Sequence, residues 1–196
     1  MDAHRDSILA HLRESCRVKQ SFSAELLSRI ETFAQRSADA LAQGRKLVFF
    51  GNGGSAADAQ HLAAELTVKL HAHRPSLAAL ALTTNSSVLT AAGNDFGFEQ
   101  IFSRQVESLV SPGDVLVALS TSGTSPNILR ALDAPAARAA YRVAFTGETG
   151  GELNSRVDLL INVPSRNAQH IQEAHITIGH IACALIEQMR MGRAAH

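Results

Sequence analysis

The chain has 196 residues, 45% of them apolar and 18% charged, and its eighteen basic residues balance eighteen acidic ones. This length suits one domain, and the balanced charge gives no reason to expect nucleic acid or an anionic membrane as a partner. Short apolar runs, a mixed N-terminus and two distant cysteines, Cys16 and Cys183, argue against a membrane span, a signal peptide and a disulfide framework. We therefore expect a cytoplasmic protein with reduced thiols.

Residues 1–43 are predicted to form a helical extension. One apolar pattern includes Ile8 and Leu12, and a second runs from Leu26 to Leu41, both with the three-and-four-residue step of an amphipathic helix. Gly44 is a helix stop signal, so the main domain is expected to cover residues 44–196.

In the main domain, short apolar runs alternate with helical segments. The runs lack a clean alternation of apolar and polar residues, which is typical of a parallel sheet covered on both faces. The five predicted strands are residues 46–50, 77–83, 114–120, 141–146 and 158–163, and a last helix is expected at about 168–189. The sequence thus predicts an α/β fold with a parallel five-stranded sheet flanked by helices.

Two loops at the carboxyl ends of predicted strands are rich in glycine and hydroxyl side chains. The first, residues 51–55, reads GNGGS, and the second, residues 120–126, reads STSGTSP. Exposed backbone N–H groups at a helix N-terminus favour an anion, and Ser125 and Pro126 suit the N-cap and first helical position. Ordinary turns would explain either loop alone, but two such loops in one sheet favour a phosphate site.

The spacing of the glycines argues against a nucleotide. A P-loop needs a lysine after its glycines, and none follows here. The dinucleotide pattern is nearly matched by Gly51, Gly53 and Ala56, but the acidic residue expected after the second strand is missing from residues 82–85. A sugar phosphate is the better candidate ligand.

Two helices carry groups that could do chemistry. His61 and Glu65 are four residues apart on the helix after Ser55, and Gln172 and His180 are eight apart on the last helix. A His-Glu pair facing a Gln-His pair could bind a divalent metal such as zinc, or act as general acid and base. A surface pair in a chain with nine histidines would explain the spacing as well.

Other polar residues are expected to be less informative. His71 and His73 lie in a polar connection and should be exposed to solvent. Asn94 and Asp95 follow a helical pattern and Gly93, so a turn would explain them as well as a site would.

As an ordered set, several motifs resemble the SIS (sugar isomerase) domain family, and most closely its sedoheptulose 7-phosphate isomerases. The motifs are GNGGSAADAQH, GNDFGFE, FSRQVE, STSGTSPN and IQEAHITIGH, and the resemblance runs from about residue 35 to the C-terminus. It implies a flavodoxin-like sheet, a homotetramer with active sites at subunit interfaces, and a sugar phosphate as substrate. The implied reaction converts D-sedoheptulose 7-phosphate to D-glycero-D-manno-heptose 7-phosphate by enediol chemistry, the first step toward the ADP- or GDP-heptose of bacterial glycans.

The resemblance also assigns roles to particular residues. The substrate is expected to contact Asn52, Gly53, Gly54, Ser55, Glu65, Asn94, Asp95, Ser120, Thr121, Ser122, Ser125 and Gln172. Within this set, the serines and Thr121 would hold the phosphate, and Asn94 and Asp95 the sugar hydroxyls. One zinc ion per subunit would be held by His61, Glu65, Gln172 and His180, and Glu65 and His180 would form the catalytic pair.

Two alternatives within the same family remain. One is a non-catalytic protein that binds the bacterial replication initiator, which lacks the Glu-His pair that this chain has. The other is a sugar-phosphate-sensing module. The chain also departs from the family pattern at Lys69, at Asn85 and at residues 168–170, which puts details of substrate choice in doubt.

Overall fold

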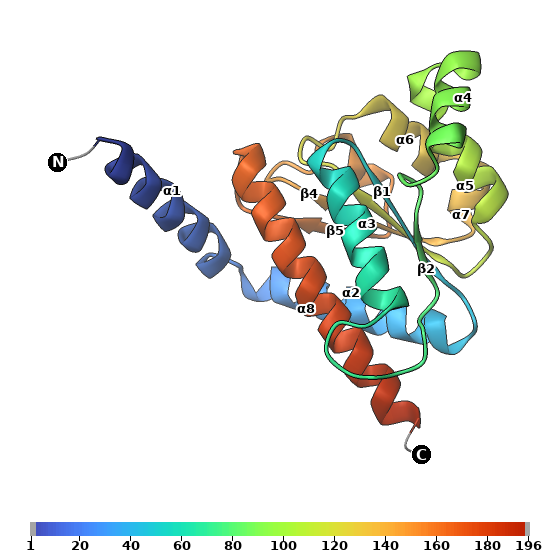
Figure 1. The fold of residues 1–196 in the computed structure, drawn as a ribbon, viewed down its shortest axis with the longest axis horizontal. Coiled ribbons are helices and arrows are strands. Elements are labelled where there is room, and N and C mark those ends of the chain that lie inside the picture. The colour runs from blue at the N-terminus through green and yellow to red at the C-terminus, as the bar shows by residue number, and fades with distance from the viewer. Residues whose placement is uncertain (1–2, 195–196) are drawn as a thin grey trace.

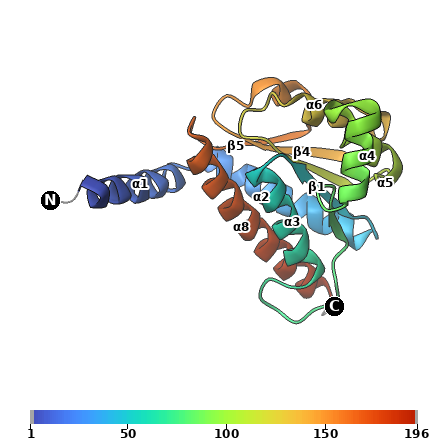
Figure 2. The ribbon, with the colours of Figure 1, turned by 45° about the horizontal axis from the view of Figure 1, so that its top comes forward.

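The computed structural model of the chain describes residues 3–194 and contains a five-stranded parallel sheet with helices on both faces (Figures 1 and 2). The strands are β1 (Leu47–Gly51), β2 (Ala79–Ala81), β3 (Val115–Leu119), β4 (Tyr141–Thr146) and β5 (Leu159–Asn162). Their order in the sheet is β2-β1-β3-β4-β5, and every neighbouring pair is parallel. The predicted fold is confirmed, although β2 is shorter than the run of residues 77–83.

The helices fall into two groups. The longer ones are α1 (Ala3–Gln20), α2 (Ala24–Ala42), α3 (Gly54–Thr67), α4 (Ser86–Phe96) and α8 (Ala168–Ala194). The shorter ones are η1 (Phe98–Gln100), α5 (Ser103–Leu109), α6 (Pro126–Asp133), α7 (Pro135–Arg138) and η2 (Gly151–Ser155). Within residues 3–194, no helix is both long and apolar enough to span a membrane.

Alternate strand residues feed two separate cores, because successive side chains of a strand point to opposite faces of the sheet. Leu47 and Phe49 of β1 pack with residues of α2, α3 and α8, whereas Val48 and Phe50 pack with residues of α4 to α7. Both faces are therefore buried, which explains why the strand sequences lack a polar face.

The two helices of the predicted extension behave differently. Helix α2 begins at the N-cap Ser23, whose side chain accepts a hydrogen bond from the Leu26 N–H, and it packs on α8 and the sheet. Helix α1 contacts α8 and otherwise extends away from the body (Figures 1 and 2). The boundary proposed between residues 43 and 44 stays a prediction.

The strand order places a topological switch point between β1 and β3. In flavodoxin-like sheets, ligands bind in the crevice at the carboxyl ends of the strands at such a point. Both loops singled out in the sequence, residues 51–55 and 120–126, follow these two strands. The fold thus brings the predicted phosphate loops to the position where a ligand is expected.

The interpretation of Asn94 and Asp95 as a turn is wrong. Gly93 does not end the preceding helix, because α4 continues through Asn94 and Asp95 to Phe96. The helix ends at Gly97, whose φ of 90° is a conformation that favours glycine.

Candidate active site

The first glycine-rich loop joins β1 to α3. Gly53 is the N-cap of α3 with a φ of 55°, so the backbone at this position suits glycine. Asn52 exchanges two hydrogen bonds of 2.9 Å with Asn127, a buried residue in the first turn of α6. This reciprocal amide pair fixes the first loop against the second.

The second loop joins β3 to α6. The Ser120 hydroxyl accepts a hydrogen bond of 3.2 Å from the Gly123 N–H, and the Ser122 hydroxyl accepts one of 3.3 Å from the Thr124 N–H. Ser125 is the N-cap of α6, followed by Pro126 as predicted, but its hydroxyl lies 3.5 Å from that of Ser120 instead of capping the helix. The hydroxyl groups of Ser120 and Ser125 thus face each other across the loop.

A cavity of about 60 Å³ lies between the two loops. Its lining residues are Asn52, Ser55, Leu119, Ser120, Thr121, Ser125 and Gln172. Ligand pockets usually have about 300–1,000 Å³, so within one chain this cavity suits a single group such as a phosphate. Of the predicted substrate residues, six come together here.

Gln172 reaches this cavity because α8 passes close to the start of α3. A Cβ on Gly54 would lie 2.7 Å from the Gln172 side-chain amide, so a larger residue at position 54 would displace that amide. Gln172 is therefore placed beside the phosphate loops, and its expected role as a metal ligand stays a prediction.

His61, Glu65 and His180 form a cluster at the other end of the site. The Nε2 atoms of His61 and His180 are 2.7 Å apart, and His61 Nε2 lies 3.2 Å from Glu65 Oε1. Their three ligand atoms lie within 4.8 Å of one another. Two imidazole nitrogens this close must share a proton or a cation, because two bare lone pairs would repel each other.

The approach of α3 to α8 that creates this cluster depends on a small residue. A Cβ on Gly179 would lie 2.5 Å from Cδ2 of Leu62, which is almost fully buried on α3. Gly179 precedes His180, and Leu62 follows His61. The close contact between Gly179 and Leu62 thus sets the distance between the imidazoles of His61 and His180.

Asp58 lies on α3 near His61 and Glu65 and is a third ionisable residue of this helix. It lies one turn before His61, and one of its carboxylate oxygens is buried without a hydrogen-bond partner among the described residues. Burial raises the pKa of Asp58 to about 6, against a smaller opposing effect of His61. The spacing of three residues from His61 was a signal for Asp58 that our sequence reasoning missed.

Asn127 was also missed, for a different reason. Its partner, Asn52, is 75 residues away in the chain. Because the pairing depends on the packing of two loops, local spacing carries no signal for it.

A second cluster joins α1 to α8. One Glu173 oxygen lies 2.9 Å from His11 Nε2, and the other lies 3.2 Å from His170 Nδ1. Hydrogen bonds from Ser15 and from both imidazoles lower the pKa of Glu173 to about 2, although burial opposes this. The carboxylate is fully satisfied by these donors, so we interpret the cluster as a contact between helices and not as a metal site.

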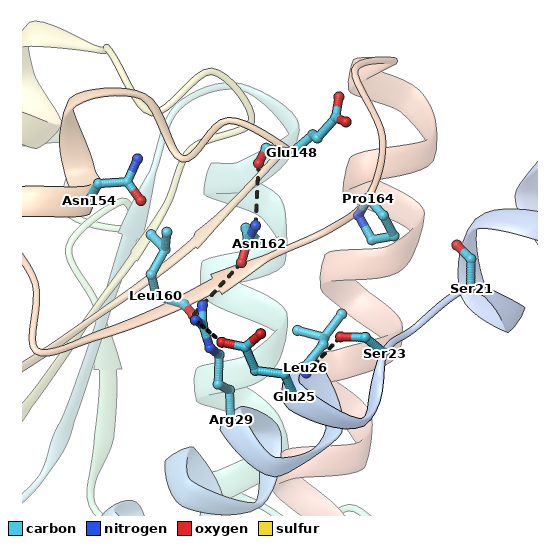
Figure 3. Close-up of a pocket in the computed structure, with 10 residues that line it drawn as sticks. All are labelled: Ser21, Ser23, Glu25, Leu26, Arg29, Glu148, Asn154, Leu160, Asn162 and Pro164. Atoms are coloured by element: carbon cyan, nitrogen blue, oxygen red, sulfur yellow. Dashed lines mark hydrogen bonds and ion pairs between the residues drawn. The ribbon is translucent and has the colours of Figure 1, made fainter.

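A polar cavity of about 320 Å³ lies between the start of α2 and β5 (Figure 3). Its only guanidinium among the described lining residues belongs to Arg29, which already donates to the Leu160 carbonyl and to Asn162 Oδ1 and pairs with Glu25. Glu148 also lines the cavity. Two carboxylates and a satisfied guanidinium make it a poor site for a phosphate.

Three of the remaining histidines have defined environments. His71 and His73 are exposed, as predicted. His175 is fully buried and lies 3.1 Å from the Thr146 carbonyl, and burial lowers its pKa to about 4, so it is neutral and links α8 to β4.

The residues that depart from the family pattern have local contacts. Asn85 is the N-cap of α4 and accepts a hydrogen bond from the Val88 N–H, so it keeps the capping role that an aspartate would have. Lys69 is exposed, and its Nζ lies 3.5 Å from His73 Nε2.

Asn94 and Asp95 are exposed and hydrogen-bond to each other, and their contact with sugar hydroxyls stays a prediction.

Comparison with known proteins defines the class. The structure is a doubly wound parallel sheet with two hydroxyl-rich loops at its switch point. The family model described as SIS domain matches residues 10–147, which is more than half of the chain. The chain therefore belongs to the SIS domain family.

Within that family, the chain belongs with the phosphoheptose isomerases. It is 50% identical to the phosphoheptose isomerase of Geobacter sulfurreducens over 183 residues, which cover 93% of this chain and 97% of that protein. The structure of the phosphoheptose isomerase of Neisseria gonorrhoeae matches with a TM-score of 0.89 at 42% identity, over 95% of this chain and 100% of the other. That of Francisella tularensis matches with a TM-score of 0.91 at 35% identity, again over 95% and 100%.

Proposed function

We propose that this chain is an aldose-ketose isomerase that interconverts D-sedoheptulose 7-phosphate and D-glycero-D-manno-heptose 7-phosphate. The relatives named as phosphoheptose isomerases support this substrate at high identity and coverage. The observation that carries the proposal is that His61, Glu65 and His180 lie together on α3 and α8, the two helices that also bring Ser55 and Gln172 to the cavity between the loops. The phosphate and the reacting carbonyl lie at opposite ends of such a sugar, as these two groups of residues do along α3.

In the proposed reaction, Ser55, Ser120 and Ser125 hold the phosphate and so orient the sugar along α3. Glu65 removes a proton from the carbon beside the carbonyl and returns it to the neighbouring carbon. His180 moves a proton at the two oxygens, so the enediol forms and collapses without a free charge. Positioned acid and base groups of this kind typically contribute about 10²–10⁴-fold each to the rate.

The same cluster fits a zinc ion. Two imidazole nitrogens and a carboxylate oxygen within 4.8 Å are a donor set that suits zinc, and a cation between the imidazoles would replace the proton that they otherwise share at 2.7 Å. We propose His61, Glu65 and His180 as ligands, with Gln172 as the fourth. When bound, the ion would stabilise the partial negative charge that develops on the substrate oxygens during proton transfer.

We also propose that the protein is a homotetramer with active sites at its subunit interfaces. Two observations support a neighbouring subunit in contact with this chain. The exposed apolar side chains of α1 include Ile8 and Leu12, which are 61% and 55% exposed. The His61 side chain is 47% exposed, so the cluster is open on one side.

Replacement of Glu65 by Gln tests the proposal. We expect the wild-type protein to convert sedoheptulose 7-phosphate when zinc is supplied, and E65Q to bind the sugar phosphate with turnover reduced at least about 10²-fold. Product analysis measures turnover, and calorimetry measures binding. The control is E107Q, because Glu107 lies on α5 and forms an exposed ion pair with Arg104.

Two outcomes would contradict this proposal in different ways. An active E65Q protein would exclude Glu65 as the base. A wild-type protein that binds the sugar phosphate without converting it under any metal condition would favour a sensing module. Failure to bind it at all would favour the protein that binds the replication initiator.

A further inference from the structure

An extended connection of residues 68–78 joins α3 to β2 without regular secondary structure. It follows directly after the helix that carries His61 and Glu65. Connections of this length usually have their own function or their own anchoring contacts. Here the anchor is a buried ion pair between Arg74 in the connection and Glu187 on α8, with Arg74 Nε 2.8 Å from Glu187 Oε1.

Glu187 is almost fully buried, and its carboxylate binds the backbone of the connection. It accepts hydrogen bonds from the N–H groups of Leu70, His71 and Ala72, at 3.3, 3.1 and 3.2 Å. Burial alone would raise the pKa of Glu187, but these hydrogen bonds and the contact with Arg74 outweigh burial and lower it. The carboxylate is therefore charged and holds the connection on α8.

Arg74 makes the complementary contacts to α3. Its Nη2 donates to the Glu65 carbonyl at 2.9 Å, and its Nη1 donates to the Leu66 carbonyl at 2.8 Å. The last carbonyls of a helix lack partners within the helix, so the guanidinium completes the end of α3. The planar guanidinium of Arg74 thus binds both the main-chain carbonyl of Glu65, the proposed catalytic base, and the Glu187 carboxylate on α8. A lysine could not make this set of contacts.

This chain of contacts joins the two halves of the proposed metal and acid-base cluster. Glu187 lies seven residues after His180, which is two turns of α8, or about 10 Å along its axis. Arg74 holds the backbone of Glu65 itself. Between them, Gly179 and Leu62 pack in close contact. The relative position of α3 and α8 is therefore set at two points, one of them ionic.

We propose that Arg74 and Glu187 form a positioning clamp that sets the spacing of His61 and Glu65 against His180. The proposal rests on the proposed function of this cluster. Catalytic and metal-binding groups must be held within about 0.5 Å of their productive geometry, and a misplacement of 1 Å can cost about 10²-fold in rate. Among the described residues, the hydrogen bonds of Arg74 and Glu187 join α3, α8 and the connection, so the clamp is expected to act on the chemistry and not on phosphate binding.

The test compares R74M and E187Q with R74K and with a matched control. The control is K46M, because Lys46 forms a different ion pair with a buried carboxylate, that of Asp114, 2.6 Å apart, which joins the start of β1 to the start of β3 and so tests destabilisation of the fold. Three quantities are measured for each full-length variant: the dissociation constant for Co²⁺ by its absorption spectrum, kcat and KM for sedoheptulose 7-phosphate, and the melting temperature.

We expect R74M and E187Q to weaken Co²⁺ binding at least tenfold and to lower kcat about 10- to 100-fold, with KM nearly unchanged. R74K should fall between them and the wild type, because it keeps the charge but loses the fork. K46M should lower the melting temperature and leave the Co²⁺ dissociation constant and kcat as in the wild type.

The clamp is overturned if R74M and E187Q lose thermal stability but keep wild-type Co²⁺ binding, because the pair would then be structural alone. If either variant does not fold, R74K decides by the same comparison. Wild-type protein that binds Co²⁺ without turnover would sink the proposed function, and the Co²⁺ measurements would still test the clamp.

Discussion

Asp58 is the residue whose environment is least favourable in the candidate site. One of its carboxylate oxygens is buried and unpartnered among residues 3–194, and burial raises its pKa to about 6. The raised pKa means that the folded protein holds the proton more tightly than the unfolded chain, whose pKa is near 3.9. The contribution of this carboxyl group to the free energy of unfolding is therefore fully present below about pH 4 and is lost as the pH rises through 6.

Replacing Asp58 by Asn should remove this loss. In the presence of a chelator at pH 7.5, we expect D58N to raise the free energy of unfolding by about 1 kcal/mol, a value discounted for partial exposure of the side chain. Near pH 4 the two proteins should be equally stable. Urea unfolding at both pH values measures the difference. An equal gain at both would show that the ionisation of Asp58 is not its cause.

The spacing of residues within one helix was the signal for the His-Glu pair on α3 and was also present for Asp58, whereas the other residues that were missed pair between elements. His61 and Glu65 share a face of α3, so a step of four residues was enough to link them. That His180 lies 2.7 Å from His61 depends on how two helices pack, which the resemblance implied and the spacing alone left open. Asn127 and the clamp residue Arg74 are recognisable only once their partners are placed.

At the scale of elements, α1 is held by a polar latch made of His11, His170 and Glu173. The hydrogen bonds from Ser15 and the imidazoles lower the pKa of Glu173 to about 2. Since the unfolded value is near 4.3, the stability it contributes is present above about pH 4 and is lost as the pH falls toward 2. The charge of this carboxylate therefore helps to dock α1 on α8.

Replacing Glu173 by Gln should loosen that docking at neutral pH. A hydrogen bond to a charged group contributes about 1.5 kcal/mol, so we expect hydrogen exchange in α1 to become roughly tenfold faster. Exchange in α3 should not change. The matched control is E14Q, because the Glu14 side chain pairs with Arg17 within α1. Unchanged exchange of α1 in E173Q would show that Val18 and other apolar contacts hold the helix without the latch.

The sheet was predictable because each strand is apolar on both faces, and the helices because their apolar residues repeat at the helical period. The end of α4 was not predictable, because the sequence does not show which glycine adopts a positive φ. Gly93 lies within the helix, and Gly97 ends it. For α1 the pattern correctly predicted an amphipathic helix. It gave no indication that the apolar residues would lie away from the body of the same chain.

At the scale of the whole molecule, the exposed apolar residues of α1 argue for a surface covered by another copy of the chain. Ile8, Leu9 and Leu12 are 61%, 37% and 55% exposed, on a helix that projects from the body (Figure 2). Removing such side chains from water contributes about 25 cal/mol per Å². A helix face of this kind is therefore expected to pack against its equivalents in the proposed homotetramer.

The double substitution I8E/L12E should prevent this packing, because two buried carboxylates without partners would cost several kcal/mol. Light scattering should show four chains per particle for the wild type and fewer for the variant. Isomerase activity should fall with the assembly at low protein concentration, since the proposed active sites lie between subunits. The control R13E adds a negative charge at an exposed position of the same helix and should stay tetrameric. A variant that remains tetrameric would place the interface elsewhere, and an active dissociated variant would show that one chain contains a complete site.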